Sequence, residues 1–326
     1  MKITKSKLNQ IIKEEIEQLV RGRSNISLSS DQAQNIRQTQ NRAKKIIRLL
    51  SSTDPGNVEL GLSILDTLKN QQLIDTIASY IVFRSDGRIT IRGFKTPNET
   101  LEMILNYFAE KSVHVKDMLA QIENLMIYFN NFITNVDFLR FCTNLTTLNL
   151  YDCSSLQNVN GLQGLTNLMW LNLSDCISLQ NVDGLKECTN LMYLNLSYCS
   201  SLQNVDGLEG CTNLTSLDLS WCKSLQNVDG LEGLTNLTTL SLEGCSSLEN
   251  VDTLQGLTNL TSLDLGGCWS LQNVDALQGL TNLTYLELGW CTSLPLELQE
   301  LFESNEYGTA YEQFMKALNA SKGNQP

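Results

Sequence analysis

The sequence predicts an α/β protein in which a solenoid of short stacked repeats lies between two helical ends. Leucine and cysteine recur at intervals of 23 residues through the second half of the chain. Each unit contains a Leu-x-Leu step, whose period of two residues is typical of a short strand with one face turned inward. A single unit cannot bury its apolar residues, whereas stacked units bury a continuous core between neighbours. These observations together predict a solenoid.

The N-terminal segment, residues 1–22, is expected to form a basic amphipathic helix or arm. Its apolar residues recur at helical spacing, opposite lysines and glutamates: Ile3, Leu8, Ile11, Ile12, Ile16, Leu19 and Val20. Several roles are open for it: binding a partner helix or assembly, lying on an anionic membrane, docking on the acidic body, or serving as a tag. Glu14, Glu15 and Glu17 reduce its cationic character, which favours a partner helix over a membrane. Residues 23–30 are expected to be a linker.

Residues 31–121 are predicted to be a helical region with one small hairpin. Two helices are expected over 31–50 and 57–82, with Asp54-Pro55-Gly56 as the turn between them. The Asp86-Gly87 pair, between two short β-branched runs, predicts the hairpin. Asn98 follows a proline and can cap a further helix, and one more helix precedes the repeats. The region would cap a solenoid whose first unit otherwise exposes its core.

The repeats are predicted to span residues 122–294. A degenerate unit covers 122–144, six full units cover 145–282, and a half unit covers 283–294. Counting from the first leucine of each unit as position 1, the later apolar positions come every third residue, which favours a tight 3₁₀-like or extended turn. Pro295 ends the pattern, and residues 295–326 are expected to form a helical C-terminal cap.

The segment Leu145-x-x-Leu148-x-Leu150-x-x-Cys153, repeated along the chain, resembles the leucine-rich repeat family. The resemblance implies a curved solenoid with a parallel sheet on its concave side, and a use in protein recognition. The Leu-Thr-Asn-Leu segment is similar to that of the short bacterial or regulatory-subunit type. The family often has asparagine at position 9. Here only Asn130 keeps it, and the other seven units have cysteine, as in the cysteine-containing subtype.

The ten cysteines are expected to be buried thiols. Seven occupy position 9, and the other three, Cys142, Cys188 and Cys211, stand where other units have leucine, which marks a core position. Neighbouring cysteines of a stack would be about 4.8 Å apart, a distance that does not forbid disulfides. A cytoplasmic location favours thiols. No Cys-x-x-Cys pair occurs, and we expect neither a metal nor a cofactor.

Two polar ladders run through the repeats. Position 16 carries aspartate in most units: Asp183, Asp206, Asp229, Asp252 and Asp275. One interpretation is that these residues cap backbone N–H groups at a turn. The other interpretation is that these carboxylates bind calcium, because a cation would offset the repulsion between stacked carboxylates. Asn160 in the first unit, and the glycine that often follows, favour capping. Asparagine at position 14 is expected to be structural as well.

The candidate binding residues lie at positions 3, 5, 7 and 8, which should face solvent on the concave side. They are Tyr151, Asp152, Trp170, Asp175, Tyr193, Tyr198, Asp218, Trp221, Tyr285, Glu287 and Trp290. Aromatic anchors are enriched at interface hot spots, and carboxylates around them would steer a basic partner. The alternative is that these side chains only solubilise the sheet or stack across strands. We place the hot spot on the first four full units, with Tyr285 and Trp290 as a separate patch.

The distribution of charge constrains the function. The chain has a net charge of −12, but residues 1–50 carry 11 basic and 4 acidic residues, whereas residues 145–294 carry 2 and 15. The repeats are therefore not expected to bind nucleic acid. No run is long enough to span a membrane, and the N-terminus lacks the apolar core of a secretory signal, so a cytoplasmic location is expected.

The function we predict is a non-catalytic module that binds a protein or peptide, with basic groups, on the concave face. The only histidine, His114, is expected to be a packing or surface residue, and no phosphate loop or nucleophile motif occurs. The sequence is therefore not expected to be an enzyme. The alternatives are a structural or assembly component, of the phage or complex type, attached through residues 1–22, or a bacterial effector.

Overall fold

The computed structural model describes residues 30–52, 55–79, 81–83, 89–91, 98–127, 130–296, 298–299 and 314. The chain divides into two compact units, one formed by Met1–Val82 with Ile89–Pro97 and the other by Phe83–Arg88 with Asn98–Pro326. The helix or arm expected over residues 1–22, and most of the helical cap expected after Pro295, lie outside the described residues.

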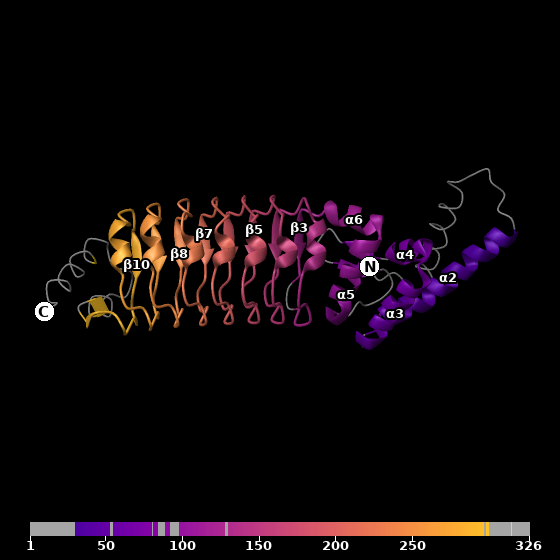
Figure 1. Cartoon of the computed structure of the whole chain (residues 1–326), viewed down its shortest axis with the longest axis horizontal. Helices are drawn as coiled ribbons and strands as arrows, with labels where there is room; N and C mark the ends of the chain where they lie inside the picture. Colours follow the sequence, from indigo (N-terminus) through magenta and orange to yellow (C-terminus); the bar gives the residue numbers. More distant parts are fainter. Residues whose placement is uncertain are drawn as a thin grey trace, which may run out of the picture. The chain divides into compact units, whose positions relative to one another are not determined.

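The first of these compact units contains three packed helices, α2 (Ser30–Leu50), α3 (Pro55–Leu68) and α4 (Gln71–Ala78). Helix α2 packs against both α3 and α4 (Figure 1). The packing buries aliphatic side chains from all three helices: Ile46, Ile47, Leu50, Val58, Leu65, Leu73 and Ile77. The short strands β1 (Ile81–Phe83) and β2 (Ile89–Ile91) pair with each other, as the Asp86-Gly87 signal predicts.

The expectation of one helix over 57–82 is wrong, because the segment breaks at Lys69. Lys69 has a φ of 44°, which ends α3 in the left-handed conformation. Asn70 then starts α4, since its side chain accepts a hydrogen bond from the backbone N–H of Leu73 at 3.0 Å. The apolar spacing runs through this break, so hydrophobic periodicity alone did not reveal it.

The second compact unit contains helices α5 (Asn98–Lys111) and α6 (Val113–Ala120), which are followed along the chain by one open sheet of eight parallel strands. The strands lie side by side in chain order (Figure 1). They are β3 (Asn124–Met126), β4 (Thr147–Asn149), β5 (Trp170–Asn172), β6 (Tyr193–Asn195), β7 (Ser216–Asp218), β8 (Thr239–Ser241), β9 (Ser262–Asp264) and β10 (Tyr285–Glu287). Each residue pairs with the equivalent residue of the next unit, as Leu148 does with Leu171. The repeat register is therefore also the sheet register, and the fold is the solenoid that the repeat predicts.

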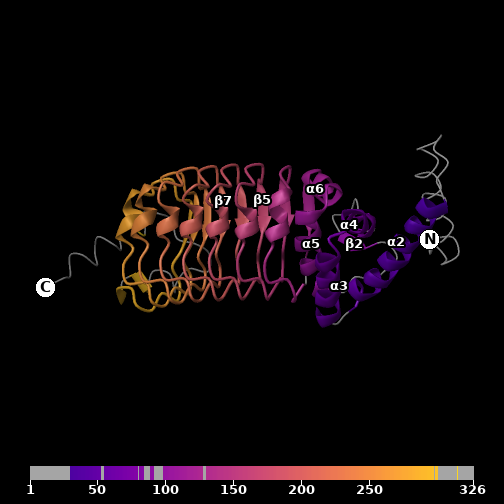
Figure 2. The same cartoon turned by 45° about the vertical axis from the view of Figure 1, so that its right-hand side comes forward.

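Between consecutive strands the chain forms a 3₁₀ helix, as the three-residue spacing predicts. Figure 2 shows the segments that connect the strands stacked side by side. The 3₁₀ helices are η1 (Asp137–Phe141), η2 (Asn160–Leu162), η3 (Asp183–Leu185), η4 (Asp206–Leu208), η5 (Asp229–Leu231), η6 (Asp252–Gly256) and η7 (Asp275–Gly279). The stacking is close at the glycine of the Val-Asp-Gly step. A Cβ on Gly207 would lie 2.0 Å from the carbonyl oxygen of Val182, so only glycine fits that approach.

The core between sheet and 3₁₀ helices is a stack of leucines, valines and cysteines that are almost fully buried. All ten cysteines are buried free thiols. Each position-9 thiol donates a hydrogen bond to a backbone carbonyl of the preceding unit, as Cys199 Sγ does to Leu173 at 3.2 Å. Burial raises the pKa of the Cys222 thiol to about 12. The cysteine ladder therefore links each unit to the preceding one through thiol donors.

Asparagines, rather than the aspartates of position 16, provide the side-chain oxygens at the start of the 3₁₀ helices. Asn204 Oδ1 accepts from the backbone N–H of Asp206 at 3.3 Å, and Asn181 does the same for Asp183. A second asparagine row, at position 23, donates to carbonyls of the preceding unit, as Asn213 does to Thr189 at 2.9 Å. Among the described residues, no group of three or more His, Cys, Asp or Glu side chains is placed to hold a metal ion.

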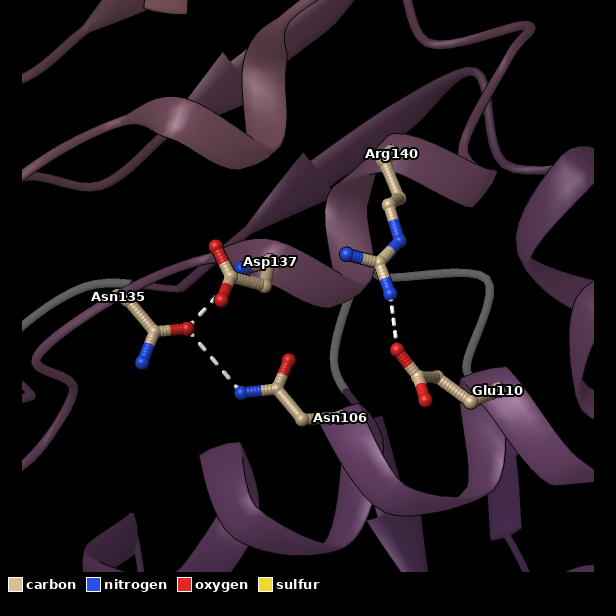
Figure 3. Close-up of polar contacts among 5 residues, drawn as sticks. All are labelled: Asn106, Glu110, Asn135, Asp137 and Arg140. Carbon is tan, nitrogen blue, oxygen red and sulfur yellow. Dashed lines mark hydrogen bonds and ion pairs between the residues drawn. The ribbon is translucent and has the colours of Figure 1, made fainter.

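Helices α5 and α6 cover the first unit of the solenoid and contact η1. Figure 3 shows the polar part of this contact, where Arg140 forms an ion pair with Glu110. Asn135 Oδ1 accepts hydrogen bonds from Asn106 Nδ2 and from the backbone N–H of Asp137, both at 3.1 Å. Phe108 and Phe138 are among the side chains buried beside these polar contacts. His114 is exposed on α6.

Candidate protein-binding face

The sheet presents one face to solvent because its strands alternate. In β5 the central Leu171 is buried, while Trp170 and Asn172 are half-buried on the outer side. Positions 3 and 5 of every full unit follow this pattern, and positions 7 and 8 come directly after the strand. We call the surface formed by positions 3, 5, 7 and 8 the strand face.

The position-5 side chains of the strand face stabilise the turn that follows each strand. Asn149 Oδ1 accepts from the backbone N–H of Tyr151 at 2.9 Å. Asp218 Oδ1 accepts from both the backbone N–H and the hydroxyl of Ser220, and Glu287 Oε1 accepts from the backbone N–H of Gly289. Asp218 and Glu287, which the sequence proposes as binding residues, therefore also have a structural role.

Position 8 has a left-handed backbone in every full unit and in the half unit. The residues and their φ angles are Asp152 (54°), Asp175 (60°), Tyr198 (61°), Trp221 (63°), Gly244 (69°), Gly267 (70°) and Trp290 (64°). Glycine and aspartate tolerate this conformation, whereas bulky side chains rarely adopt it. For an L-residue other than glycine it costs about 1–2 kcal/mol. Tyr198, Trp221 and Trp290 are therefore held in a conformation that their side chains disfavour.

Four of the predicted aromatic residues form two parallel pairs across neighbouring units. The rings of Trp170 and Tyr193 have centroids 5.4 Å apart and planes at 4°. The rings of Tyr198 and Trp221 have centroids 6.1 Å apart and planes at 3°. Such pairs contribute about 0.5–1.5 kcal/mol beyond their buried area. The structure thus brings these residues together two by two, on the half of the repeats where the sequence places the hot spot.

The surroundings of Trp221 hold its ring in place. A Cβ on Gly244, the equivalent residue of the next unit, would lie 2.8 Å from the indole, so the ring lies directly against the glycine. The ammonium group of Lys223 lies over the indole, 5.7 Å from the ring centroid. The ring is thus enclosed by Tyr198, Gly244 and Lys223.

Burial and neighbouring carboxylates raise the pKa of two carboxyl groups on the strand face, those of Asp175 and Glu243. Burial raises the pKa of Asp175, and the neighbouring Asp152 raises it further. Burial also raises the pKa of Glu243; Asp264 and Asp218 raise it further, whereas a hydrogen bond from the Trp221 side chain lowers it. Each carboxylate therefore lies in a negative potential, which favours an approaching cation.

Three further predicted aromatic residues, Tyr151, Tyr285 and Trp290, are not members of the two aromatic pairs. Tyr151 is half-buried, and its backbone is held by Asn149. Tyr285 and Trp290 are exposed in the last unit, Trp290 by 78%. Burial raises the pKa of Tyr285, and Asp264, Glu287 and Glu243 raise it further. Whether these residues form a patch of their own stays a prediction.

Sequence reasoning missed several exposed apolar side chains. Met169 and Met192 are exposed at position 2, where other full units have threonine, and they directly precede Trp170 and Tyr193. Trp269 is 59% exposed at position 10. The signal was present in the sequence, since each of these residues departs from the consensus of its own position.

The comparisons with known proteins come from families and from solved structures. The family model described as "BspA type Leucine rich repeat region" matches residues 90–203 and 189–294, in six copies. No curated protein matches the chain. No described helix is long and apolar enough to cross a membrane.

Among solved structures, the chain is similar to internalin C2 of Listeria monocytogenes, with 22% identity, a TM-score of 0.43, and coverage of 60% of this chain and 89% of that one. It is similar to an internalin (inlF) of the same organism, with 20% identity, a TM-score of 0.32, and coverage of 58% and 68%. It is also similar to the leucine-rich repeat domain of the type III effector XCV3220 (XopL), with 18% identity, a TM-score of 0.48, and coverage of 73% and 88%.

Proposed function

Because the chain belongs to the BspA-type leucine-rich repeat proteins, we propose that it is a protein-interaction module whose strand face binds a protein or peptide carrying basic groups. Leucine-rich repeat regions are typically interaction scaffolds without catalytic activity. We assign this chain the same non-catalytic role, in the cytoplasm. The ten free thiols support a reducing compartment.

The observation that carries the proposal is the left-handed backbone at Tyr198 and Trp221. Two other units have glycine at this position, so the fold does not require an aromatic residue there. Side chains held in disfavoured backbone conformations cluster at functional sites, where the surrounding structure maintains the strain. The presence of aromatic residues at these two positions therefore indicates a role in binding rather than a role in folding.

The charge of the repeats supports a basic partner. Residues 145–294 carry 15 acidic and 2 basic residues. Burial raises the pKa values of Asp175 and Glu243, and neighbouring carboxylates raise them further, so a cation placed beside these groups relieves repulsion that already exists. Charge complementarity of this kind speeds association and selects partners.

The proposal is tested by selecting peptides from a random 12-residue display library on the immobilised full chain. We expect the selected peptides to be enriched in arginine and lysine. The best peptide should then bind the Asp152→Asn/Asp175→Asn variant at least fivefold more weakly. Asparagine also tolerates the left-handed conformation, so this variant should stay folded.

A charge-matched control separates the strand face from the overall acidity of the protein. The variant Asp206→Asn/Asp229→Asn removes the same charge from the 3₁₀ helices η4 and η5. Its affinity should stay within twofold of the wild type. Selection of peptides without basic residues, or equal losses in the two variants, would contradict the proposal.

A further inference from the structure

The acidic side chains of the strand face fall into two groups, and this division bears on what kind of segment the face can bind. The first group, which we call the N-terminal acidic pair, consists of Asp152 and Asp175. The second, the C-terminal acidic group, consists of Glu243 and Asp264. In each group burial raises the pKa of one carboxyl and its neighbour raises it further: Asp152 acts on Asp175, and Asp264 acts on Glu243.

The register of the sheet fixes the distance between the two groups. Asp175 follows strand β5, and Glu243 follows strand β8. Strands β5 to β8 are consecutive neighbours in the sheet. Three strand spacings separate the two carboxylates along the solenoid, which corresponds to about 14 Å.

The space between the two groups contains an aromatic pair and a positive charge. Asp218, on β7, also lies in this space, and its carboxylate accepts hydrogen bonds from Ser220. Tyr198 and Trp221 occupy position 8 in the two intervening units, with their rings parallel. Lys223 places its ammonium group over the Trp221 ring. Residues 145–294 contain only two basic residues, Lys186 and Lys223. The ammonium group of Lys186 lies 3.9 Å from the carboxylate Oδ1 of Asp183, which is on η3. Lys223 therefore repels a basic side chain at the centre of the face, while the two acidic groups attract one at each end.

An extended polypeptide advances about 3.3 Å per residue, so 14 Å corresponds to about four residues. We propose that the partner is an extended segment with two basic side chains about four residues apart, one at each acidic group, and apolar residues between them on Tyr198 and Trp221. This inference rests on the proposed function, because it specifies the partner of the same face. Aromatic surfaces bind proline-rich and other apolar extended segments in the same manner.

The spacing is tested with rigid peptides of the form Arg-(Pro)n-Arg, which carry a single arginine at each end. With n of one, four or nine, a polyproline rise of about 3.1 Å per residue places the two arginines about 6, 15 and 31 Å apart. Each peptide is titrated by calorimetry into the full chain. We expect the peptide with four prolines to bind at least fivefold more tightly than the other two.

Variants at the two ends test whether both acidic groups are used at once. Asp175→Asn and Glu243→Gln should each lower the affinity for the four-proline peptide to that of the one-proline peptide. Neither substitution should change the affinity for the one-proline peptide more than twofold, because that peptide can bind the acidic group that remains intact. Asp229→Asn, on η5, is the charge-matched control and should leave all affinities unchanged.

The role of Lys223 provides an independent readout. In Lys223→Gln the centre of the face no longer repels a cation, so the one-proline peptide should gain affinity and the preference for four prolines should fall at least twofold. An unchanged preference in this variant would show that Lys223 does not divide the face.

The possible results separate this inference from the function on which it rests. If the peptides bind equally well and Asp175→Asn weakens all of them alike, the spacing is wrong while the basic-partner function stands. If none of the peptides binds the wild-type chain, the basic-partner function itself fails. Only an optimum at four prolines that both end variants abolish supports the inference.

Discussion

The indole ring of Trp221 lies against Gly244, so closely that a Cβ on the glycine would come within 2.8 Å of the ring. The two residues occupy the same position in consecutive units, and both have the left-handed backbone. The missing side chain of one unit thus makes room for the large side chain of the preceding unit. The strand face is in this sense built from pairs of units rather than from single residues.

This contact predicts that Gly244→Ala is more destabilising than the equivalent change in the next unit. Both Gly244 and Gly267 have positive φ, so alanine is strained at either position. A Cβ on Gly267, however, meets nothing closer than 3.6 Å. We expect Gly244→Ala to cost about 1 kcal/mol more than Gly267→Ala, because it must displace the ring. Urea unfolding of both variants measures the difference, and equal costs would contradict the contact.

The close stacking of the 3₁₀ helices predicts a larger effect at Gly207. Its Cβ would lie 2.0 Å from the carbonyl oxygen of Val182, so alanine forces the two units apart. Gly207→Ala should lower the free energy of unfolding by about 3 kcal/mol or more. Gly256→Ala is the control, since a Cβ there meets nothing within 4 Å. A loss of less than 1 kcal/mol for Gly207→Ala would show that the solenoid yields easily at this point.

The buried thiols predict that the native protein is inert to thiol reagents. Burial raises the pKa of Cys153 and of Cys211 to about 12, so neither forms the reactive thiolate at pH 8. We expect Ellman's reagent to react with fewer than about one thiol per native chain in minutes, and with all ten cysteines after unfolding in guanidinium. Fewer than ten reactive thiols in the unfolded, unreduced chain would reveal disulfides.

The crowded carboxylates predict a dependence of stability on pH. Burial raises the pKa of Asp264 above its ordinary value of 3.8. A carboxyl with a raised folded-state pKa binds a proton more readily in the folded chain. Its contribution to stability is therefore present at low pH and is lost as the pH rises from the ordinary value through the raised one.

The variant Asp264→Asn isolates this effect. Three other units have asparagine at the equivalent position, namely Asn149, Asn172 and Asn195. The substituted side chain can therefore keep the hydrogen bond from the following turn. We expect the melting temperature of Asp264→Asn to exceed that of the wild type by about 1–3 °C at pH 7. No gain is expected at pH 3, where Asp264 is protonated. A gain of equal size at both pH values would contradict the electrostatic cause.

The solenoid could be predicted from the sequence because each apolar position is repeated many times, so that chance is averaged out. The break at Lys69 could not, since a single residue decides it and the apolar spacing continues across it. The aromatic pairs follow from the register, because residues 23 apart become neighbours on adjacent strands, as Trp170 and Tyr193 do. That argument was available from the repeat alone.

The left-handed backbone at position 8 had a signal in the sequence that was not used. Asp152 and Asp175 alternate there with Gly244 and Gly267, and glycine with aspartate is the residue set that this conformation favours. The placement of Lys223 over Trp221 had no such signal. It depends on the side-chain conformation of a long, flexible residue, which no repeat pattern determines.

We expect Tyr198 and Trp221 to serve binding at a cost to the backbone conformation. The most direct test is the variant Tyr198→Gly/Trp221→Gly, measured both for its melting temperature and for its affinity for a basic peptide selected on the wild-type chain. Glycine removes the left-handed strain, which offsets the lost ring stacking, so the melting temperature should stay within about 3 °C of the wild type. The affinity should fall at least tenfold. Unchanged affinity, or a drop of more than about 8 °C in the melting temperature, would contradict the claim, since the rings would then be dispensable for binding or required for folding.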